Sequence, residues 1–358
     1  MIALRKGACI SMLMKQAVWV GDRKVEIRQV PMPEVNGSPI IRVTDVGICG
    51  SDVHFWEEGS QHLGVHAGHE YSGIIYDPGS SSFQKGDRVV GYTQNPKNEP
   101  CGRCPNCLVG DFDRCTNRTV KIGIGSELEH PGAFAEYVSW FPSGMFLLPD
   151  SVSNEEAALI EPAAVALHAM SLSEIKPGAN ILILGGGIIG QCVAEWARMY
   201  GASTIVLTET NKKKIEFIRN IGIVDHVLNG RDPEVEKQIN ALLPHGMDMF
   251  FDCVAVEGPF NMAIRNLKRG GTGVLVGVSM HPVSFDYYST VVYQKRLQGS
   301  KGHVPTDFQA VLAALTHHTI DLKKYITRRI RLSDLQQGLE QIRDQGDDVK
   351  VLVKCMEP

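Results

Sequence analysis

The sequence lacks the features that mark membrane proteins and nucleic-acid-binding proteins. No apolar run approaches the roughly 20 residues that a spanning helix needs. A net charge of -4 gives no general attraction to nucleic acid or to an anionic membrane. Internal repeats, low-complexity tracts and a clear signal peptide are also missing. We therefore expect a cytoplasmic protein without nucleic-acid or membrane partners, in which residues 1–14 are an extension of unknown role.

The cysteines lack the spread of a disulfide framework. There are nine of them, an odd number, and four fall between positions 101 and 115. A disulfide-stabilised protein is typically small and secreted, whereas this chain has 358 residues, 43% of them hydrophobic and 21% charged. This length allows two domains, each with its own core. The cysteine pattern indicates a reducing compartment and a metal cluster.

The first part of the chain predicts short strands separated by glycine, proline and aspartate. The expected strands cover residues 16–20, 24–30, 40–46, 71–76, 88–92 and 133–140. A Gly-Asp pair between the first two is typical of a hairpin. Since no long helical period interrupts these segments, we predict a β-rich domain over residues 15–162.

From residue 163 onward, strands alternate with helices. Strands are expected at 181–184, 204–208, 249–254, 273–278 and 296–299, and helices at 188–200, 211–221, 233–243 and 258–267. This alternation predicts an α/β Rossmann domain with a doubly wound parallel sheet over residues 163–300. Two further helices (306–317 and 333–343) and a closing strand (349–354) follow. We assign residues 301–358 to the β-rich domain, which leaves the Rossmann unit inserted within it.

A glycine-rich loop, GGGIIG, follows the first strand of the Rossmann unit and opens its first helix. Such glycines allow a tight turn, a close approach of a pyrophosphate and close packing of helix on strand. An acid ends the next strand, where it would accept from the ribose hydroxyls and repel a 2′-phosphate, which favours NAD over NADP. The three lysines that follow could instead meet a phosphate. The competing interpretation is a purely structural turn. The candidate cofactor contacts are Gly185, Gly187, Ile188, Ile189, Gly190, Glu209 and Lys214.

Four cysteines form the most specific pattern in the chain. Cys101, Cys104, Cys107 and Cys115 have the short spacing with which four thiolates surround one Zn²⁺ and close the site to water. An iron–sulfur cluster usually has different spacing, and unmetallated thiols are the other alternative. We predict a structural zinc site.

A second group of ligand-type residues mixes sulfur, nitrogen and oxygen. Cys49 stands in CGSDVH, and His69 and Glu70 follow in GHE. A thiolate, an imidazole and a carboxylate together suit Zn²⁺, and a site that keeps one position open is catalytic. Ser51 and His54 have the chemistry needed to move a proton. Each residue alone has a commoner role, as a buried small side chain or an ordinary imidazole.

Glu161 is a carboxylate in the otherwise apolar segment LIEPAAV. Burying it without a partner would be costly, and a metal ion would be a good partner. The competing interpretation is an exposed acid at a helix start. Four further residues, Trp56, Tyr92, Phe134 and His303, are expected to shape the substrate pocket.

The motifs together resemble the zinc-dependent medium-chain alcohol dehydrogenases, and within them the sorbitol (polyol) dehydrogenase group. The resemblance spans residues 15–354 and is carried by CGSDVHFW, GHEYSG, CGRCPNC, GAFAEY, IEPAAVALHA, LGGGIIG and DVKVLVK. It implies a GroES-like catalytic domain, NAD as cofactor, two zinc ions per chain (one catalytic, one structural) and a homodimer or homotetramer. The complete cysteine quartet departs from animal sorbitol dehydrogenases, so the subgroup stays open.

The resemblance also implies roles for single residues. Cys49, His69 and Glu70 would hold the catalytic zinc, and Glu161 would be a ligand or would hold the zinc-bound water. Asp52 would orient the His69 ring. Ser51 and His54 would form the proton relay.

These features predict an enzyme that transfers a hydride from a polyol or secondary alcohol to NAD and gives a ketone or ketose. Threonine or 2,3-butanediol dehydrogenase is the alternative within the family. A cofactor-binding protein without turnover is the remoter alternative.

Overall fold

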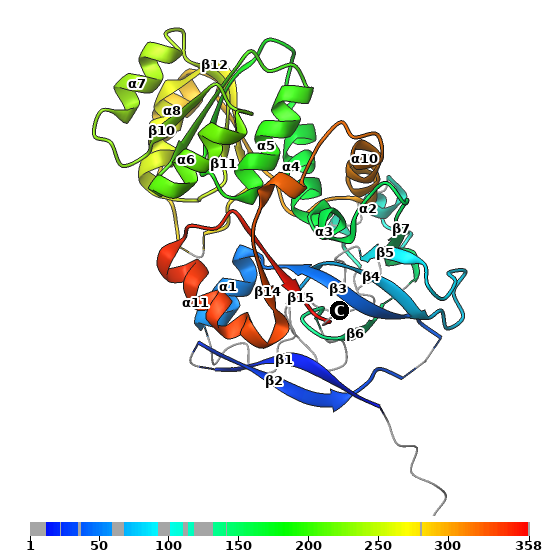
Figure 1. Cartoon of the computed structure of the whole chain (residues 1–358). Coiled ribbons are helices and arrows are strands. Elements are labelled where there is room, and N and C mark those ends of the chain that lie inside the picture. Colours follow the sequence, from blue (N-terminus) through cyan, green and yellow to red (C-terminus); the bar gives the residue numbers. More distant parts are fainter. Residues whose placement is uncertain are drawn as a thin grey trace, which may run out of the picture.

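The fold was obtained as a computed structural model that describes residues 12–21, 23–34, 37–58, 68–91, 101–109, 114–117, 132–140, 142–279 and 281–356. Its strands form a seven-stranded sheet, a six-stranded sheet and a two-stranded hairpin. In Figure 1 the six-stranded sheet with its helices forms the upper part of the molecule, and the other two sheets form the lower part.

The seven-stranded sheet joins the two ends of the chain. Its order is β14-β15-β3-β4-β5-β7, with β6 paired to β3. The closing strand β15 runs antiparallel to β3, so the C-terminal segment does return to the β-rich part. Strands β1 and β2 pair antiparallel as the predicted hairpin, and this hairpin lies beside the seven-stranded sheet. The strands are β1 Leu13–Gly21, β2 Lys24–Pro31, β3 Ile40–Gly47, β4 Glu70–Asp77, β5 Arg88–Gly91, β6 Tyr137–Ser139, β7 Met145–Leu147, β14 Ile326–Arg331 and β15 Lys350–Lys354.

The six-stranded sheet is parallel throughout, with the order β10-β9-β8-β11-β12-β13. Its first strand in sequence, β8, lies near the middle, and the chain winds outward from it in both directions. The doubly wound parallel sheet predicted from the sequence is therefore confirmed. The strands are β8 Asn180–Leu184, β9 Thr204–Glu209, β10 His226–Asn229, β11 Met247–Asp252, β12 Leu267–Leu275 and β13 Arg296–Gly299.

Helices cover both faces of the parallel sheet. One face packs against α4, α5 and α6, and the other packs against α7 and α8. The longer helices are α1 Gly50–Glu58, α4 Ile160–Ser173, α5 Ile188–Met199, α6 Lys212–Ile221, α7 Val235–Leu242, α8 Glu257–Asn266, α10 Pro305–Thr316 and α11 Leu335–Gln345. The short ones are α2 Pro105–Leu108, α3 Asn154–Ala157, α9 Tyr287–Val292, η4 Pro142–Gly144, η5 Lys323–Tyr325 and η6 Leu332–Asp334.

Some predicted elements were wrong or absent. Residues 133–136 form no strand apart from a single bridge between Ala135 and Gln16. Helices α1, α2, α3, α4 and α9 and strands β7, β10 and β14 were not predicted. Helix α4 was missed because Pro162 stands inside it, but proline is tolerated in the first turn, where its missing N–H has no intrahelical partner. Among the described residues, no helix is long and apolar enough to cross a bilayer.

Candidate active site

A cavity of about 410 Å³ joins the two parts of the molecule. The loop that leads from β3 into α1, with Cys49, lines one side, and the glycine loop after β8 lines another. The segment 348–351, at the start of β15, completes the wall. Binding sites of doubly wound proteins lie at the carboxyl ends of their parallel strands, and this cavity is in that position.

Strand pairing brings Cys49 and His69 together. Strands β3 and β4 are antiparallel, and their register places Gly47 opposite Glu70. The residue before β4 therefore lies beside the residues that follow β3. A side chain at position 47 would be impossible, because a Cβ there would lie 2.0 Å from Glu70 Oε2. This glycine leaves room for the Glu70 carboxylate over the backbone of β3.

Three side chains converge as a possible metal site. Cys49, His69 and Glu70 each offer a ligand atom, and these atoms lie within 4.8 Å of one another. The donor set is one sulfur, one imidazole nitrogen and one carboxylate oxygen, which is of the kind that Zn²⁺ accepts. Three protein donors leave a tetrahedral ion one position for water or substrate. The residues present therefore fit a catalytic zinc ion.

Asp52 supports this group from the first turn of α1. Its side chain is 1% exposed and accepts from the N–H of Cys49 (2.9 Å) and of Gly68 (3.2 Å). Its Oδ1 lies 3.7 Å from Nδ1 of His69. Burial would lower the pKa of His69, but the charges of Asp52 and Cys49 raise it well above its usual value. Asp52 thus fixes the backbone beside two of the three donors, at Cys49 and at the residue before His69.

Lys350 is a member of the site that was not predicted from the sequence. Its ammonium group donates to Glu70 Oε2 (2.5 Å) and to the carbonyl of Ile48 (3.0 Å). Both charged side chains are only 1% exposed. Burial would lower the pKa of Lys350, but the Glu70 carboxylate raises it above its usual value. Glu70 is therefore a paired carboxylate, and one of its oxygens is already bonded.

Glu161 and His303 form a second charged pair close to the group, in which His303 is buried and Glu161 is 12% exposed. Glu161 lies in the first turn of α4, and its Oε1 is 3.6 Å from Nε2 of His303. Burial would raise the pKa of Glu161, but His303 and His69 lower it. Glu161 is therefore near His69, although it is not within the compact set of three donors. His303 was expected in the substrate pocket; it is buried, and it contacts Glu161 and the ring of Phe308.

The two residues of the predicted proton relay lie on one helix. Ser51 and His54 are three residues apart on α1 and so share a face. Ser51 is half-buried next to Cys49, and His54 is exposed to solvent. The helix thus connects the candidate metal site with the surface.

The glycine loop has the close contacts that a phosphate cradle needs. Gly185 has a φ of +98°, which L side chains rarely adopt. A Cβ on Gly190 would lie 2.0 Å from the carbonyl oxygen of Gly185, so helix α5 can pack this closely only with glycine there. Gly187 is the N-cap of α5, which begins at Ile188. The free N–H groups of this helix end suit a phosphate.

Glu209 ends β9 and lines both the first cavity and a second one of about 350 Å³. Its carboxylate accepts from the N–H of Gly186 (3.0 Å) and of Asn211 (2.9 Å). The second cavity is lined by apolar residues such as Pro233 and Met262. Lys214 lines the first cavity. Glu209 therefore lies where the two cavities meet, at the carboxyl end of β9, where doubly wound proteins bind dinucleotides.

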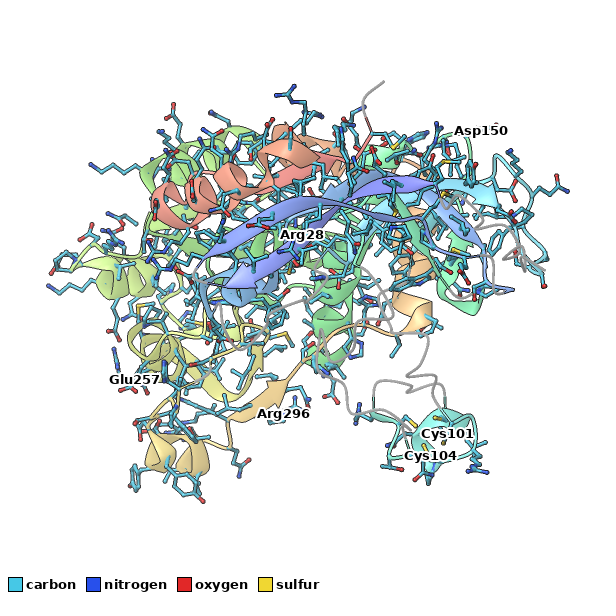
Figure 2. The ribbon with its side chains drawn as sticks, turned by 90° about the horizontal axis from the view of Figure 1, so that it is seen from below. Arg28, Cys101, Cys104, Asp150, Glu257 and Arg296 are labelled. Carbon is cyan, nitrogen blue, oxygen red and sulfur yellow. The ribbon has the colours of Figure 1, made fainter. Side chains whose placement is uncertain are left out.

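The four-cysteine group forms a separate lobe. Its ligand atoms, from Cys101, Cys104, Cys107 and Cys115, lie within 4.8 Å of one another. Zn–S bonds of about 2.3 Å in a tetrahedron would place the sulfurs about 3.8 Å apart. Backbone N–H groups of Cys107 and Thr116 lower the pKa of Cys104 to about 6, whereas burial raises the pKa of Cys107 to about 12. Figure 2 shows Cys101 and Cys104 at the edge of the molecule.

The expected pocket residues differ in their positions. Trp56 and Phe134 are 3% and 1% exposed and belong to the core of the β-rich part, where Phe134 stacks on Trp19. Their bulk supports the fold around the site. Tyr92 lies outside the described residues.

Comparison with known proteins defines the class. The model of the alcohol dehydrogenase GroES-like domain matches residues 36–150, and that of the zinc-binding dehydrogenases matches residues 189–317. Sorbitol dehydrogenase of Bacillus subtilis is 30% identical over 356 residues, which are 95% of this chain and 97% of that protein. L-threonine 3-dehydrogenase of Pectobacterium atrosepticum is 29% identical over 347 residues, which are 95% of this chain and 91% of that protein.

A solved structure agrees with these sequence matches. A protein described as a zinc-binding dehydrogenase from Sinorhizobium meliloti 1021, bound to NADP, superposes with a TM-score of 0.84. It is 29% identical and covers 96% of this chain and 100% of its own. This chain belongs to the zinc-dependent medium-chain alcohol dehydrogenase family. It is accordingly an oxidoreductase that uses zinc and a nicotinamide nucleotide and acts on a small alcohol. The predicted fold class and enzyme class are thereby confirmed.

Proposed function

We propose that this enzyme oxidises a secondary alcohol of a polyol with NAD. One observation carries the proposal: the cysteine of the mixed-donor group and the glycine loop line the same cavity. A metal ion held by Cys49, His69 and Glu70 would therefore face a cofactor seated on the loop. Hydride transfer needs this juxtaposition of an activated alcohol and a nicotinamide.

The roles of the residues follow from their contacts. A zinc ion bound here supplies Lewis-acid polarisation of the alcohol oxygen. Cys49 and His69 would hold the ion, and Asp52 keeps the His69 ring and the backbone around Cys49 in place. Lys350 fixes the Glu70 carboxylate beside the Cys49 and His69 donors and offsets part of its negative charge. Glu161, held by its contact with His303, would be a further ligand or would position a water.

The proton leaves along α1. Ser51 takes it at its hydroxyl and passes it to His54, which releases it to solvent. The half-buried position of Ser51, the exposure of His54 and their shared helix face support this route.

A polyol fits the oxygen-rich surroundings. Two carboxylates, Glu70 and Glu161, lie close to His69, so the site offers several polar positions for the neighbouring hydroxyls of a substrate. The similarity to a sorbitol dehydrogenase agrees with this. The similarity to a threonine dehydrogenase makes an amino alcohol the second candidate.

NAD is the proposed cofactor because Glu209 ends β9 as an acid beside the glycine loop. Its carboxylate would accept from the ribose hydroxyls and repel a 2′-phosphate. We further propose a cytoplasmic homodimer or homotetramer. The eight described cysteines are all free, in keeping with a reducing compartment.

A substrate panel tests the proposal. Sorbitol, xylitol, L-threonine and 2,3-butanediol are each supplied with NAD and with NADP, and the reduced cofactor is followed by absorbance. We expect the highest kcat/KM with a polyol and NAD. Faster turnover of threonine or butanediol would contradict the proposed polyol substrate. Faster turnover with NADP would contradict the proposed preference for NAD.

A further inference from the structure

A contact between two distant turns lies beside the cofactor cavity. Asp347, between α11 and β15, accepts from Asn211 Nδ2 (2.9 Å) at one oxygen and from Lys213 Nζ (2.7 Å) at the other. Asn211 also donates to the carbonyl of Gln345 (3.1 Å). The turn after β9, in the nucleotide-binding part, is thus bonded to a turn of the other part.

This contact is directly connected to Glu209, the acid proposed to accept from the ribose. The N–H of Asn211 donates to Glu209 Oε1, while its side-chain amide donates to Asp347. Asn211 therefore donates hydrogen bonds to both carboxylates, those of Glu209 and Asp347. The neighbours Lys214 and Asp348 both line the cavity, which places the contact at the rim of the cavity.

The contact occupies the ammonium group of Lys213, one of three lysines that follow Glu209. Three lysines follow Glu209, and a 2′-phosphate on the adenosine ribose needs such a cation as partner. Lys213 is 76% exposed but has its ammonium on Asp347, whose charge raises the pKa of this lysine. Asn211 caps α6 through the N–H groups of Lys213 and Lys214, which fixes the backbone from which both lysines extend.

We propose that Asp347 is a cofactor-selectivity residue: it binds Lys213 and so withholds it from the 2′-phosphate of NADP. Cofactor choice is then made by two acids from different parts of the chain. Glu209 would accept from the ribose, and Asp347 neutralises Lys213, one of the three lysines beside it. The inference rests on the proposed preference for NAD.

The Asp347→Asn variant tests the idea, because asparagine has nearly the same shape but no charge. Dissociation constants for NAD and NADP are measured by titration calorimetry on the zinc-loaded full chain. We expect the Kd for NADP to fall about fivefold and that for NAD to stay within about twofold, with the gain reduced at high salt. The double variant Asp347→Asn, Lys213→Ala should lose the gain. Asp334→Asn removes a comparable surface ion pair, with Arg331, and should change neither constant.

The outcomes separate this inference from the proposed function. An unchanged Kd for NADP in Asp347→Asn overturns the inference, as does a gain that survives the loss of Lys213. If the unmodified enzyme binds NADP more tightly than NAD, the proposed cofactor preference is wrong, whatever the variant does.

Discussion

The cysteine lobe and the interdomain cavity both gather metal-binding side chains, but the chain builds them in different ways. The lobe takes four identical donors from one stretch of fifteen residues, 101–115. The cavity takes three different donors from the ends of β3 and β4, with Glu161 of α4 and Lys350 of β15 packed around them. A local set of like donors closes around an ion, whereas a dispersed set can leave one side of the ion open.

The two regions also differ in what accompanies the donors. In the cavity, each nitrogen or oxygen donor has a charged neighbour of opposite type: Asp52 for His69, and Lys350 for Glu70. In the lobe, the sulfurs accept from backbone N–H groups, such as those of Cys101 and Cys104. Charged neighbours adjust a metal's reactivity, while backbone contacts mainly hold a loop in shape. We infer that the cavity does chemistry and the lobe stabilises structure.

Removal of a donor from the cavity should have the largest effect on turnover. In Cys49→Ala we expect kcat to fall about 1,000-fold or more, because loss of the metal removes several kcal/mol of stabilisation from the transition state. Zinc content should fall from about two to about one per chain, and the Kd for NAD should change less than about twofold. Cys355→Ala, in the core at 5% exposure, is the control and should keep metal and activity. Full activity in Cys49→Ala would show that the cavity is not the catalytic site.

Breaking the buried ion pair should have the next largest effect. Lys350→Met leaves the Glu70 carboxylate buried without its partner, and we expect a loss of about 3–5 kcal/mol in the free energy of unfolding, measured with urea. Glu70→Gln in the same chain should recover most of this loss. Lys237→Met, which removes the exposed ion pair with Glu234, should cost about 1 kcal/mol or less. Equal losses from the two lysine substitutions would contradict a special role for the pair.

The relay should have a moderate effect. In His54→Ala we expect kcat to fall about tenfold with a changed pH–rate profile, since solvent partly replaces an exposed proton carrier. His226→Ala, at an exposed histidine on β10, is the matched control and should leave kcat and the pH–rate profile unchanged. Unchanged turnover and an unchanged profile in His54→Ala would remove α1 from the proton route.

Removal of a donor from the lobe should affect turnover least. Cys104→Ser should lose one zinc per chain and lower Tm by about 5 °C, while turnover per folded molecule stays within about twofold. Differential scanning calorimetry and metal analysis measure the first two effects. A loss of turnover as large as in Cys49→Ala would mean that the lobe is not merely structural.

The same contrast explains what could be predicted from the sequence. The cysteine quartet and the glycine loop are local patterns, and their spacing alone indicates the geometry found around Cys101 and Gly190. The strand, loop and helix around Gly185 were also predicted, because buried strands and amphipathic helices have different periods.

Lys350 and its role could not be predicted in this way. It lies 280 residues from Glu70 in the sequence, and a lysine in a strand is ordinarily exposed. Its only signal is the alternation in KVLVK, which puts it on the same face as Leu352. His303 beside Glu161 is likewise a product of tertiary packing, since the two residues come from α4 and from the segment before α10.

The most direct test is a crystal of the NAD complex measured with X-rays at the zinc absorption edge. We expect two anomalous peaks per chain. One should lie among the four cysteines, and the other between Cys49 and His69 with an open side toward the nicotinamide. The absence of a peak between Cys49 and His69, or a peak there whose ligands close it off from the cofactor, would contradict the account.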